Sequence, residues 1–283
     1  MSKGVLCFAS NNLEVDYVKQ AVYFAKRVKK HLNLPVTLVT SDVNYVDRLN
    51  VRTVFDKIIS VDKEKQNQKR FYDGSLHNKL LSFDNASRIN AYDLSPYEET
   101  IVLDIDYILF NNVFLNCFNQ PHNFLIYKDA IDVCHWRKNP EFEYINDNGV
   151  PFYWATCFFF RKTNEVQVFF NLMKHLKENW THYSSVFDLG TPTFRNDHIF
   201  SMAIHIMNGY KDSNWAKPMP GRKYFALDRD VIEVLDDDHV ILLVEKEKYI
   251  GEYTLASLKD TNVHLMNKLS LGGHVWNLKN KAI

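Results

Sequence analysis

The chain has 283 residues, of which 46% are hydrophobic and 24% charged, so it can bury the core of an ordinary globular protein. Its 34 basic and 34 acidic residues give a net charge of +0, which excludes a broad positive surface for nucleic acid but leaves room for a local basic patch. The densest apolar stretch, residues 152–160, is far too short to span a bilayer, so no transmembrane segment is expected.

The cysteines favour a reducing environment. Cys7, Cys117, Cys134 and Cys157 lie far apart and show no metal-binding or redox spacing. Cys7 and Cys157 fall within apolar runs, where a free thiol behaves as a small core residue. Because the N-terminus also lacks the order of residues found in a signal peptide, we expect a cytoplasmic protein, in the host cytoplasm if it is viral.

The first segments predict a parallel sheet. Residues 5–9 and 36–39 are short apolar strands, and the apolar positions between them recur at helical spacing until Pro35 ends the helix. No Gly-x-Gly-x-x-Gly follows the first strand, which argues against the usual dinucleotide fold. The second strand ends at Thr40-Ser-Asp42, where Asp42 suits a contact to a base or ribose and equally suits a turn or a helix N-cap.

A third strand is predicted at residues 57–61 and is followed by a polar loop over residues 62–75, which contains Arg70. A helix is then predicted from about residue 77 until Pro96. Lys79 lies on this helix and is either a surface lysine or a contact to a ligand.

Residues 100–110 form the stretch around which the chain is organised. Their β-branched apolar run predicts a strand buried on both faces, and Asp104 and Asp106 lie toward its end. Residues two apart on a strand point the same way, so the two carboxylates should converge. In a poorly hydrated place one carboxylate of such a pair must stay protonated, unless a cation compensates the two charges. An acid-any-acid triplet also occurs by chance on exposed loops, and the apolar flank is what favours a metal.

The Leu-Asp-Ile-Asp segment at residues 103–106, which follows an apolar strand, resembles the Asp-any-Asp motif of nucleotide-sugar-dependent glycosyltransferases with the A-type fold. The order of motifs is similar to that of the group with glycogenin and the bacterial lipooligosaccharide galactosyltransferases. The resemblance implies an α/β, Rossmann-like, mostly parallel central sheet flanked by helices. It also implies a single domain over residues 1–283, with a nucleotide-sugar-binding half at 1–130 and an acceptor-binding half at 131–283.

In this family the two acids hold Mn²⁺ or Mg²⁺ on the donor diphosphate, so the resemblance assigns Asp104 and Asp106 as metal ligands. A histidine in a late Val-His step is the third ligand, which matches His264, although coincidence among 11 histidines is a real alternative. A lysine that follows touches the diphosphate, and Lys268 stands about two positions earlier than the family pattern. A basic residue on the helix before the central strand often reaches the donor, and Lys79 takes that place.

Two further segments match the family in part. Trp154-Ala-Thr156 stands where the family usually has Asn-Ala-Gly against the donor sugar, so Trp154 removes space and Thr156 supplies a different hydrogen bond. The stretch 196–200 opens a helix, and Asp197 lies in its first turn, where the family places an acid near the reacting sugar carbon. A simple helix cap would explain Asp197 as well.

Loops on the acceptor side carry aromatic and basic residues. The long loop at 129–149 contains His135, Trp136 and Arg137, which could stack on and hydrogen-bond a sugar or a base. The Pro/Gly loop at 217–223 carries basic residues that suit a phosphate or acceptor contact, or a plain turn.

These residues together predict a metal-dependent glycosyltransferase that moves a hexose or pentose from a nucleoside-diphosphate sugar, with a uridine diphosphate donor favoured. The resemblance implies that Asp106 and Asp197 are the catalytic acids and that Asp42, Lys79, Thr156 and Lys268 contact the donor. It also favours retention of configuration, which the two acids alone do not decide. The acceptor is a glycan hydroxyl or, alternatively, a hydroxymethylated base in DNA modified by a phage enzyme, with Arg70, Arg137 and Arg222 tracking phosphates. A nucleotidyltransferase and a non-catalytic nucleotide-sugar-binding protein are the further alternatives.

Overall fold

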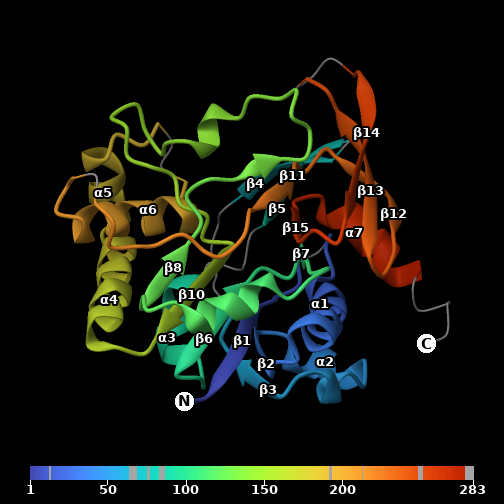
Figure 1. Cartoon of the computed structure of the whole chain (residues 1–283), viewed down its shortest axis with the longest axis horizontal. Helices are drawn as coiled ribbons and strands as arrows, with labels where there is room; N and C mark the ends of the chain where they lie inside the picture. The colour runs from blue at the N-terminus through green and yellow to red at the C-terminus, as the bar shows by residue number, and fades with distance from the viewer. Residues whose placement is uncertain are drawn as a thin grey trace.

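The computed structural model describes residues 1–12, 14–63, 69–74, 77–82, 87–190, 193–211, 213–247 and 251–277. Its central sheet has six strands in the order β3-β2-β1-β6-β10-β8 (Figure 1). Along this order the strands are Lys57–Ser60, Val36–Thr40, Lys3–Phe8, Glu99–Leu103, Cys157–Arg161 and Phe124–Ile126. In this sheet β10 runs opposite to the other five strands, which are parallel to one another. The predicted α/β architecture with a mostly parallel sheet is therefore confirmed.

Helices flank this sheet, with α1 and α2 to its right and α4 to α6 to its left in Figure 1. The helices are α1 Tyr17–Leu32, α2 Val43–Arg48, α3 Ala91–Leu94, α4 Asn164–Glu178, α5 Trp180–Val186, α6 Asn196–Met207 and α7 Lys268–Asn277. Short 3-10 turns are η1 Arg52–Val54, η2 Ser87–Asn90, η3 Val113–Asn119 and η4 Pro140–Phe142. None of the helices in these ranges is both long and apolar enough to cross a membrane.

Local signals explain where α1 begins and ends. The Asp16 side chain accepts a hydrogen bond from the amide of Lys19, which satisfies one of the free donors of the first turn. At the other end Asn33 adopts a left-handed conformation (φ 51°) that closes the helix. The buried face of α1 then covers β1 and β2, which completes the predicted strand-helix-strand unit.

Smaller sheets extend the structure beyond β6. One has the order β7-β15-β11-β9 and another the order β12-β13-β14, and β4 pairs with β5 as a hairpin. These strands are β4 Lys69–Gly74, β5 His77–Ser82, β7 Tyr107–Ile108, β9 Ile131–Asp132, β11 Tyr224–Ala226, β12 Val231–Leu235, β13 His239–Glu245, β14 Tyr253–Lys259 and β15 Val263–Leu265. Because β7 directly follows β6, the chain passes at residues 104–106 from the central sheet to the four-stranded sheet that contains β7.

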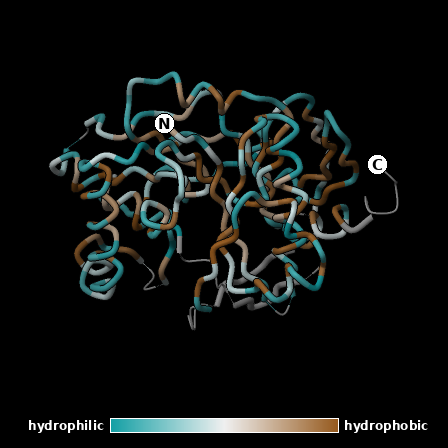
Figure 2. Tube along the Cα trace, turned by 90° about the horizontal axis from the view of Figure 1, so that it is seen from below, coloured by the Kyte–Doolittle hydropathy of each residue, from teal (hydrophilic) through white to brown (hydrophobic). Residues whose placement is uncertain are grey.

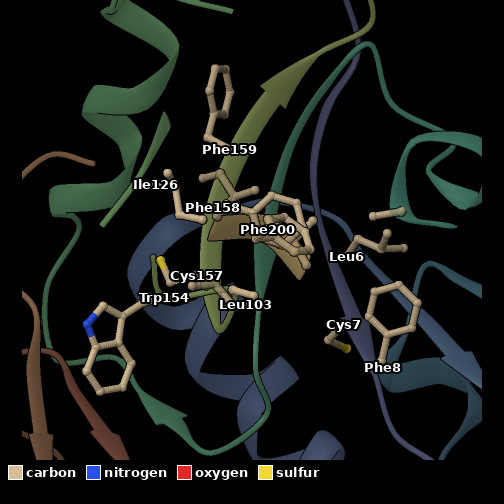
Figure 3. Packing of buried hydrophobic residues seen from close by; sticks show 14 of the residues in the cluster. Leu6, Cys7, Phe8, Leu103, Ile126, Trp154, Cys157, Phe158, Phe159 and Phe200 are labelled. Carbon is tan, nitrogen blue, oxygen red and sulfur yellow. The ribbon is translucent and has the colours of Figure 1, made fainter. Parts of the chain in front are cut away.

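Two hydrophobic clusters hold these layers together. The larger one lies around the central sheet and includes an aromatic group in which Phe158 packs 4.9 Å from Phe200 of α6, measured between ring centroids (Figure 3). The smaller one joins the sheet β7-β15-β11-β9 to the sheet β12-β13-β14 and contains Ile108, Val240 and Leu265. Many of the loops at the outline of the molecule are hydrophilic, as Figure 2 shows. The acids at residues 104 and 106 alternate with Ile105 and Tyr107 of the larger cluster, and Ile108, just beyond them, belongs to the smaller one.

The predicted helix over residues 77–96 is wrong in its first half. His77–Ser82 is strand β5, paired antiparallel with β4, so the predicted polar loop at 62–75 also contains a strand. Among the residues of this region that the structure describes, 77–82 and 87–96, the helical ones are those of η2 and α3. A stretch this short holds too few turns for helical and extended periodicity to be told apart, and pairing with β4 decides the outcome.

Candidate metal and donor site

The turn between β6 and β7 carries the two acids. The amide of Asp104 donates to the carbonyl of Thr156 at 2.9 Å, and the amide of Tyr107 donates to the carbonyl of Asp104 at 3.0 Å. Asp104 and Asp106 thus lie in a turn, and the prediction of one continuous strand over residues 100–110 is wrong. The bend is stabilised by the hydrogen bond to Thr156, which the sequence pattern of the strand could not reveal.

Asp104, Asp106 and His264 nevertheless converge. Each offers one ligand atom, and these atoms all lie within 4.8 Å of one another. His264 belongs to β15, which pairs antiparallel with β7 so that His264 stands opposite Tyr107. This pairing brings Nε2 of His264 to 3.2 Å from Oδ1 of Asp106. The structure therefore brings together the three residues that the sequence nominated as metal ligands, and their role as ligands stays a prediction.

Two cations lie against this triad, defined as Asp104, Asp106 and His264. Lys268, the first residue of α7, places Nζ 2.7 Å from Oδ2 of Asp106. Arg88 of η2 forms an ion pair with Asp104. The side chains of both acids are largely buried, so each ion pair acts in a poorly hydrated place. The negative charges of Asp104 and Asp106 are thus nearly balanced by the positive charges of Arg88 and Lys268.

The protonation states follow from burial and from these cations. Burial raises the pKa of Asp104 to about 6, although Arg88 opposes this rise. Burial also disfavours the Asp106 carboxylate, but Lys268 and His264 outweigh it and hold the pKa of Asp106 well below its usual range. Burial lowers the pKa of His264 to about 4. At neutral pH the imidazole is therefore neutral and keeps a lone pair for a metal.

Aromatic rings enclose His264. The ring of Tyr107 stacks on it, with centroids 5.5 Å apart and planes inclined by 13°. Trp154 meets it edge-on at 6.3 Å, and the indole points away from the Phe158 and Phe200 cluster (Figure 3). Trp154 is buried and also packs 5.1 Å from Phe225. The imidazole is thereby fixed in orientation by packing as well as by Asp106.

A buried lysine connects these rings. Nζ of Lys223 lies 4.6 Å from the ring centroid of Tyr107 and 4.5 Å from that of Trp154, distances typical of cation–π contacts. It also donates to Oγ1 of Thr156 at 3.0 Å and to the hydroxyl of Tyr107 at 3.3 Å. Only 1% of Lys223 is exposed, and burial lowers its pKa to about 8. Since an ammonium group only donates, the Thr156 oxygen accepts here and its own hydrogen is free to point elsewhere.

Asp197 ties α6 to the segment next to the triad. Its Oδ1 accepts from the amide of Ala155 at 3.0 Å, and its Oδ2 lies 3.6 Å from Nη2 of Arg195. The N-cap of α6 is Arg195, so Asp197 is not the helix cap that the sequence allowed as an alternative. Burial is the main cause of the raised pKa of Asp104 and of the lowered pKa of Lys223. The charge of Asp197 adds to the first shift and opposes the second, so this carboxylate lies within electrostatic range of both groups.

The remaining nominated residues lie farther out. Asp42 accepts from the amide of Asn11 at 2.7 Å and so joins the ends of β1 and β2, at the same sheet edge as the end of β6. It stands at the N-cap of α2 but forms no side-chain cap hydrogen bond. Lys79 lies on β5, and its side chain falls outside the described residues, as does that of Arg70. Nothing in the described contacts links Asp42 to the triad.

Arg137 does not face a ligand. Its guanidinium forms ion pairs with Asp132 at 2.6 Å and with Asp230 at 2.7 Å, and the side chain is 1% exposed. The expectation that Arg137 contacts a sugar, a base or phosphates is therefore wrong, because an arginine between two buried carboxylates is already neutralised. Trp136, by contrast, is 66% exposed and stacks on His135 with centroids 5.6 Å apart.

Sequence reasoning missed Arg88 and the burial of Lys223. Lys223 stands in the basic Pro/Gly loop at 217–223, and only the following β11, with buried Phe225 and Ala226, signals that the chain turns inward there. Arg88 lay in the predicted helix and carried no signal beyond the buried Ile89 next to it. Both contacts depend on partners far along the chain, which spacing alone does not reveal.

No known family profile matches the sequence, and no curated protein matches it. Among solved structures, the glycosyltransferase GlyE of Streptococcus pneumoniae TIGR4 is similar at 12% identity and a TM-score of 0.43, covering 77% of this chain and 45% of GlyE. The galactosyltransferase LgtC in complex with donor and acceptor sugar analogs is similar at 12% identity and a TM-score of 0.43, covering 72% of this chain and 70% of LgtC.

Mouse xyloside xylosyltransferase 1 is similar at 12% identity and a TM-score of 0.40, covering 74% of this chain and 83% of that protein. The chain thus spans less than half the length of GlyE and most of the length of the mouse enzyme. All three likenesses are at 12% identity and at TM-scores below 0.5.

Proposed function

We propose that this chain is a metal-dependent glycosyltransferase that moves a sugar from a nucleoside-diphosphate sugar to an acceptor hydroxyl. One observation carries the proposal: Asp104 and Asp106, in the turn that follows a strand of a mostly parallel sheet, converge with His264 of β15. Ligands of open α/β sheets collect beyond the carboxyl ends of the strands, which is where this turn lies. The residues 1–130 then supply most of the donor site, and residues 131–283 the acceptor side.

The chemistry of the triad fits a hard divalent cation. Two carboxylates and one neutral imidazole are ligands that suit Mn²⁺ or Mg²⁺, and phosphate oxygens or water would complete the coordination. The pKa of Asp104, raised to about 6 by burial, indicates that this carboxylate is under-compensated by the protein alone. When bound, the ion neutralises the charge that develops on the leaving diphosphate. A uridine diphosphate donor fits this scheme.

The residues around the triad then have distinct tasks. Lys268 keeps Asp106 ionised and presents its ammonium group beside the position of a diphosphate. Arg88, paired with Asp104, opposes the rise in the pKa of this carboxyl group and adds a guanidinium charge to the site. Thr156, held by Lys223 at its oxygen, offers its hydroxyl hydrogen to a sugar oxygen. Asp42, at the ends of β1 and β2, is the proposed contact to the nucleoside, and Lys79 stays a proposed donor contact.

Asp197 is the proposed acid on the reacting side of the sugar. It lies in the first turn of α6, holds the amide of Ala155 and is 8% exposed. A carboxylate in this position steadies positive charge at the sugar carbon or orients the acceptor hydroxyl. Retention of the anomeric configuration is the outcome we propose, and Asp106 is the second acid essential for catalysis.

Transfer to a glycan is favoured over transfer to a base in DNA. Arg137, one of the three arginines expected to track phosphates, is neutralised by Asp132 and Asp230 inside the protein. Arg222 is exposed, so it remains the only one of the three with a described surface position. Exposed Trp136 suits stacking against either a sugar or a base and does not separate the two acceptors.

The test is hydrolysis of nucleoside-diphosphate sugars with Mn²⁺, read as release of nucleoside diphosphate. We expect activity with at least one uridine or guanosine diphosphate sugar, loss of activity with a chelator, and loss in the Asp104→Asn and Asp106→Asn variants. Asp129→Asn, which removes an exposed acid, is the matched control and should retain activity. Full activity of both site variants would overturn the metal assignment. Incorporation of a labelled nucleotide without sugar transfer would instead identify a nucleotidyltransferase, and nucleotide-sugar binding without turnover a non-catalytic protein.

A further inference from the structure

A cavity lies beside α6, and none of the triad residues lines it. Its volume is about 200 Å³. The residues that line it come from the segment after β8, from the loop at 144–153 and from the end of α6: Lys128, Tyr144, Gly149, Pro151, Tyr153, His205, Asn208 and Lys211. Its size is below the range of roughly 300–1,000 Å³ that encloses a drug-sized ligand, so it suits one sugar ring or one phosphate with part of its substituent.

The segment 153–156 separates this cavity from the triad. Tyr153 lines the cavity, whereas the next residue, Trp154, contacts His264 on the other side. The amide of Tyr153 donates to Oγ of Ser201 at 2.8 Å, so α6 holds the segment at this point as well as at Asp197. Three residues of chain span roughly 10 Å at most, so the cavity lies within that reach of Thr156.

The lining is cationic. Lys128 and Lys211 are exposed at its rim, His205 and Asn208 add ring and amide nitrogens, and Tyr144 is 51% exposed. Within the described part of the chain, none of the residues that line the cavity is acidic. Two ammonium groups with a tyrosine ring beside them match a phosphate joined to a flat or ring-shaped group.

We propose that this cavity binds a phosphate group of the acceptor. This assignment rests on the proposed glycosyltransferase function. In that proposal the triad and Lys268 bind the donor diphosphate on the other side of segment 153–156, which leaves this cavity for the acceptor. The cavity itself needs no metal, since its charge comes from lysines. A phosphate-bearing acceptor would be anchored here while its hydroxyl reaches toward Asp197 across the segment.

The experiment is calorimetric titration in the presence of EDTA, which removes metal-dependent binding of diphosphates at the triad. The probes are inorganic phosphate, ribose 5-phosphate and a short single-stranded oligonucleotide. We expect at least one probe to bind with a millimolar Kd. The affinity should fall about tenfold, or 1.4 kcal/mol, in the Lys128→Met variant and by the same amount in the separate Lys211→Met variant. Lys26→Met, an exposed lysine on α1, is the matched control and should bind normally. Asp104→Asn should also bind normally.

The outcomes separate the sources and the two proposals. Binding of ribose 5-phosphate as tight as that of the oligonucleotide supports a small phosphorylated acceptor, and binding of the oligonucleotide alone supports a phosphodiester in nucleic acid. Binding that is absent for all probes, or unchanged in both lysine variants, overturns the cavity proposal. Metal-dependent donor hydrolysis should be retained in Lys128→Met and Lys211→Met. Loss of donor hydrolysis by every form of the protein would overturn the glycosyltransferase proposal and leave phosphate binding in EDTA untouched.

Discussion

Nε2 of His264 lies 3.2 Å from Oδ1 of Asp106, although burial lowers the pKa of this imidazole to about 4. At neutral pH the contact therefore joins a carboxylate to a neutral ring. The ring is enclosed by Tyr107 and Trp154, which exclude the water that would otherwise stabilise an imidazolium. His264 consequently has no proton to lose when it offers its lone pair to a metal.

His264 should make the stability of the fold depend on pH. Its pKa is about 4 in the folded chain and 6.5 in an unfolded one, so the unfolded state binds more protons between these values. Its contribution is complete above pH 6.5 and is lost as the pH falls toward about 4. The loss amounts to about 3 kcal/mol by the conversion of 1.36 kcal/mol per pKa unit. We predict that the difference in free energy of unfolding between wild type and His264→Gln shrinks by this order between pH 7 and pH 4, in urea titrations.

Comparison with the variant is necessary because Asp104 acts in the opposite direction. Its pKa is raised from 3.8 to about 6, so its contribution to stability is present at low pH and is lost as the pH rises through about 6. This contribution cancels in the difference between wild type and His264→Gln. A difference that stays constant from pH 7 to pH 4 would contradict the buried, neutral state of His264.

Asp104 should set the pH dependence of metal binding. Below about pH 6 the carboxyl group is increasingly protonated, and a metal ion must displace that proton. We predict that the affinity for Mn²⁺ is nearly constant above pH 7 and falls by up to about tenfold per pH unit below about pH 6, in calorimetric titrations. Asp104→Asn should bind Mn²⁺ weakly at every pH and without this slope. Equal wild-type affinity at pH 5 and pH 8 would exclude Asp104 as a ligand.

Lys223 should support activity at the expense of stability. Burial lowers its pKa to about 8 from 10.5, so the charged form is disfavoured inside the protein by about 3 kcal/mol at neutral pH. Lys223→Met keeps the buried stem and removes the charge, together with the hydrogen bonds to Thr156 and Tyr107. We predict that the variant unfolds at an equal or higher urea concentration, while donor hydrolysis falls by about 10–100-fold, the usual effect of losing a residue that orients metal ligands.

The control for this variant is Lys217→Met, which alters the same loop at a partly exposed lysine. It should leave both activity and stability near the wild-type values. If Lys223→Met lowered stability and activity together, Lys223 would have only a structural role. If activity were unchanged, the proposed orientation of Thr156 and Tyr107 by Lys223 would be excluded.

The parts of the fold that depend on local patterns could be predicted from the sequence. The strand-helix-strand unit around α1 rests on apolar spacing, on Asp16 and on Asn33, all of which act within a few residues. The hairpin β4–β5 could not be predicted, since it depends on pairing between two polar, weakly patterned segments. Pairing between segments far apart in sequence is a property of the whole chain.

The candidate site divides in the same way. The sequence predicts Asp104 and Asp106 as site residues because a pair of carboxylates after an apolar strand is chemically unusual. The sequence does not predict the bend that brings them together, because the bend depends on a hydrogen bond from the Asp104 amide to Thr156, in the turn just before β10. The prediction of a ligand contact for Arg137 is wrong because Asp132 and Asp230 neutralise its guanidinium. Nothing in the sequence distinguishes these two acids from others, since only the fold brings them next to Arg137.

This network makes Arg137 a structural residue. Without the guanidinium, each buried carboxylate would carry an uncompensated negative charge. Removing one member of a buried ion pair typically lowers the free energy of unfolding by about 3–5 kcal/mol. We predict a loss of this size in Arg137→Met, measured by urea unfolding. Arg137→Lys should restore little of it, because a lysine cannot bond both Asp132 and Asp230 with a planar fork. Arg222→Met, at an exposed position, should stay within about 0.5 kcal/mol of the wild type. Similar stabilities of the Arg137→Met and Arg222→Met variants would contradict this assignment.

Asp197 allows a structural role to be separated from a chemical one. Asp197→Asn keeps an oxygen that accepts from the Ala155 amide and removes the charge, so the variant should fold normally and lose donor hydrolysis by about 100-fold or more. Asp197→Ala leaves that buried amide without its acceptor and should also lose about 1–3 kcal/mol of stability. Ser201→Ala is the matched control, because it removes the acceptor of the Tyr153 amide on the same segment without touching a charge, and it should lower stability more than activity. Urea unfolding and nucleoside diphosphate release measure the two effects, and full activity of Asp197→Asn would show that the carboxylate only holds the segment in place.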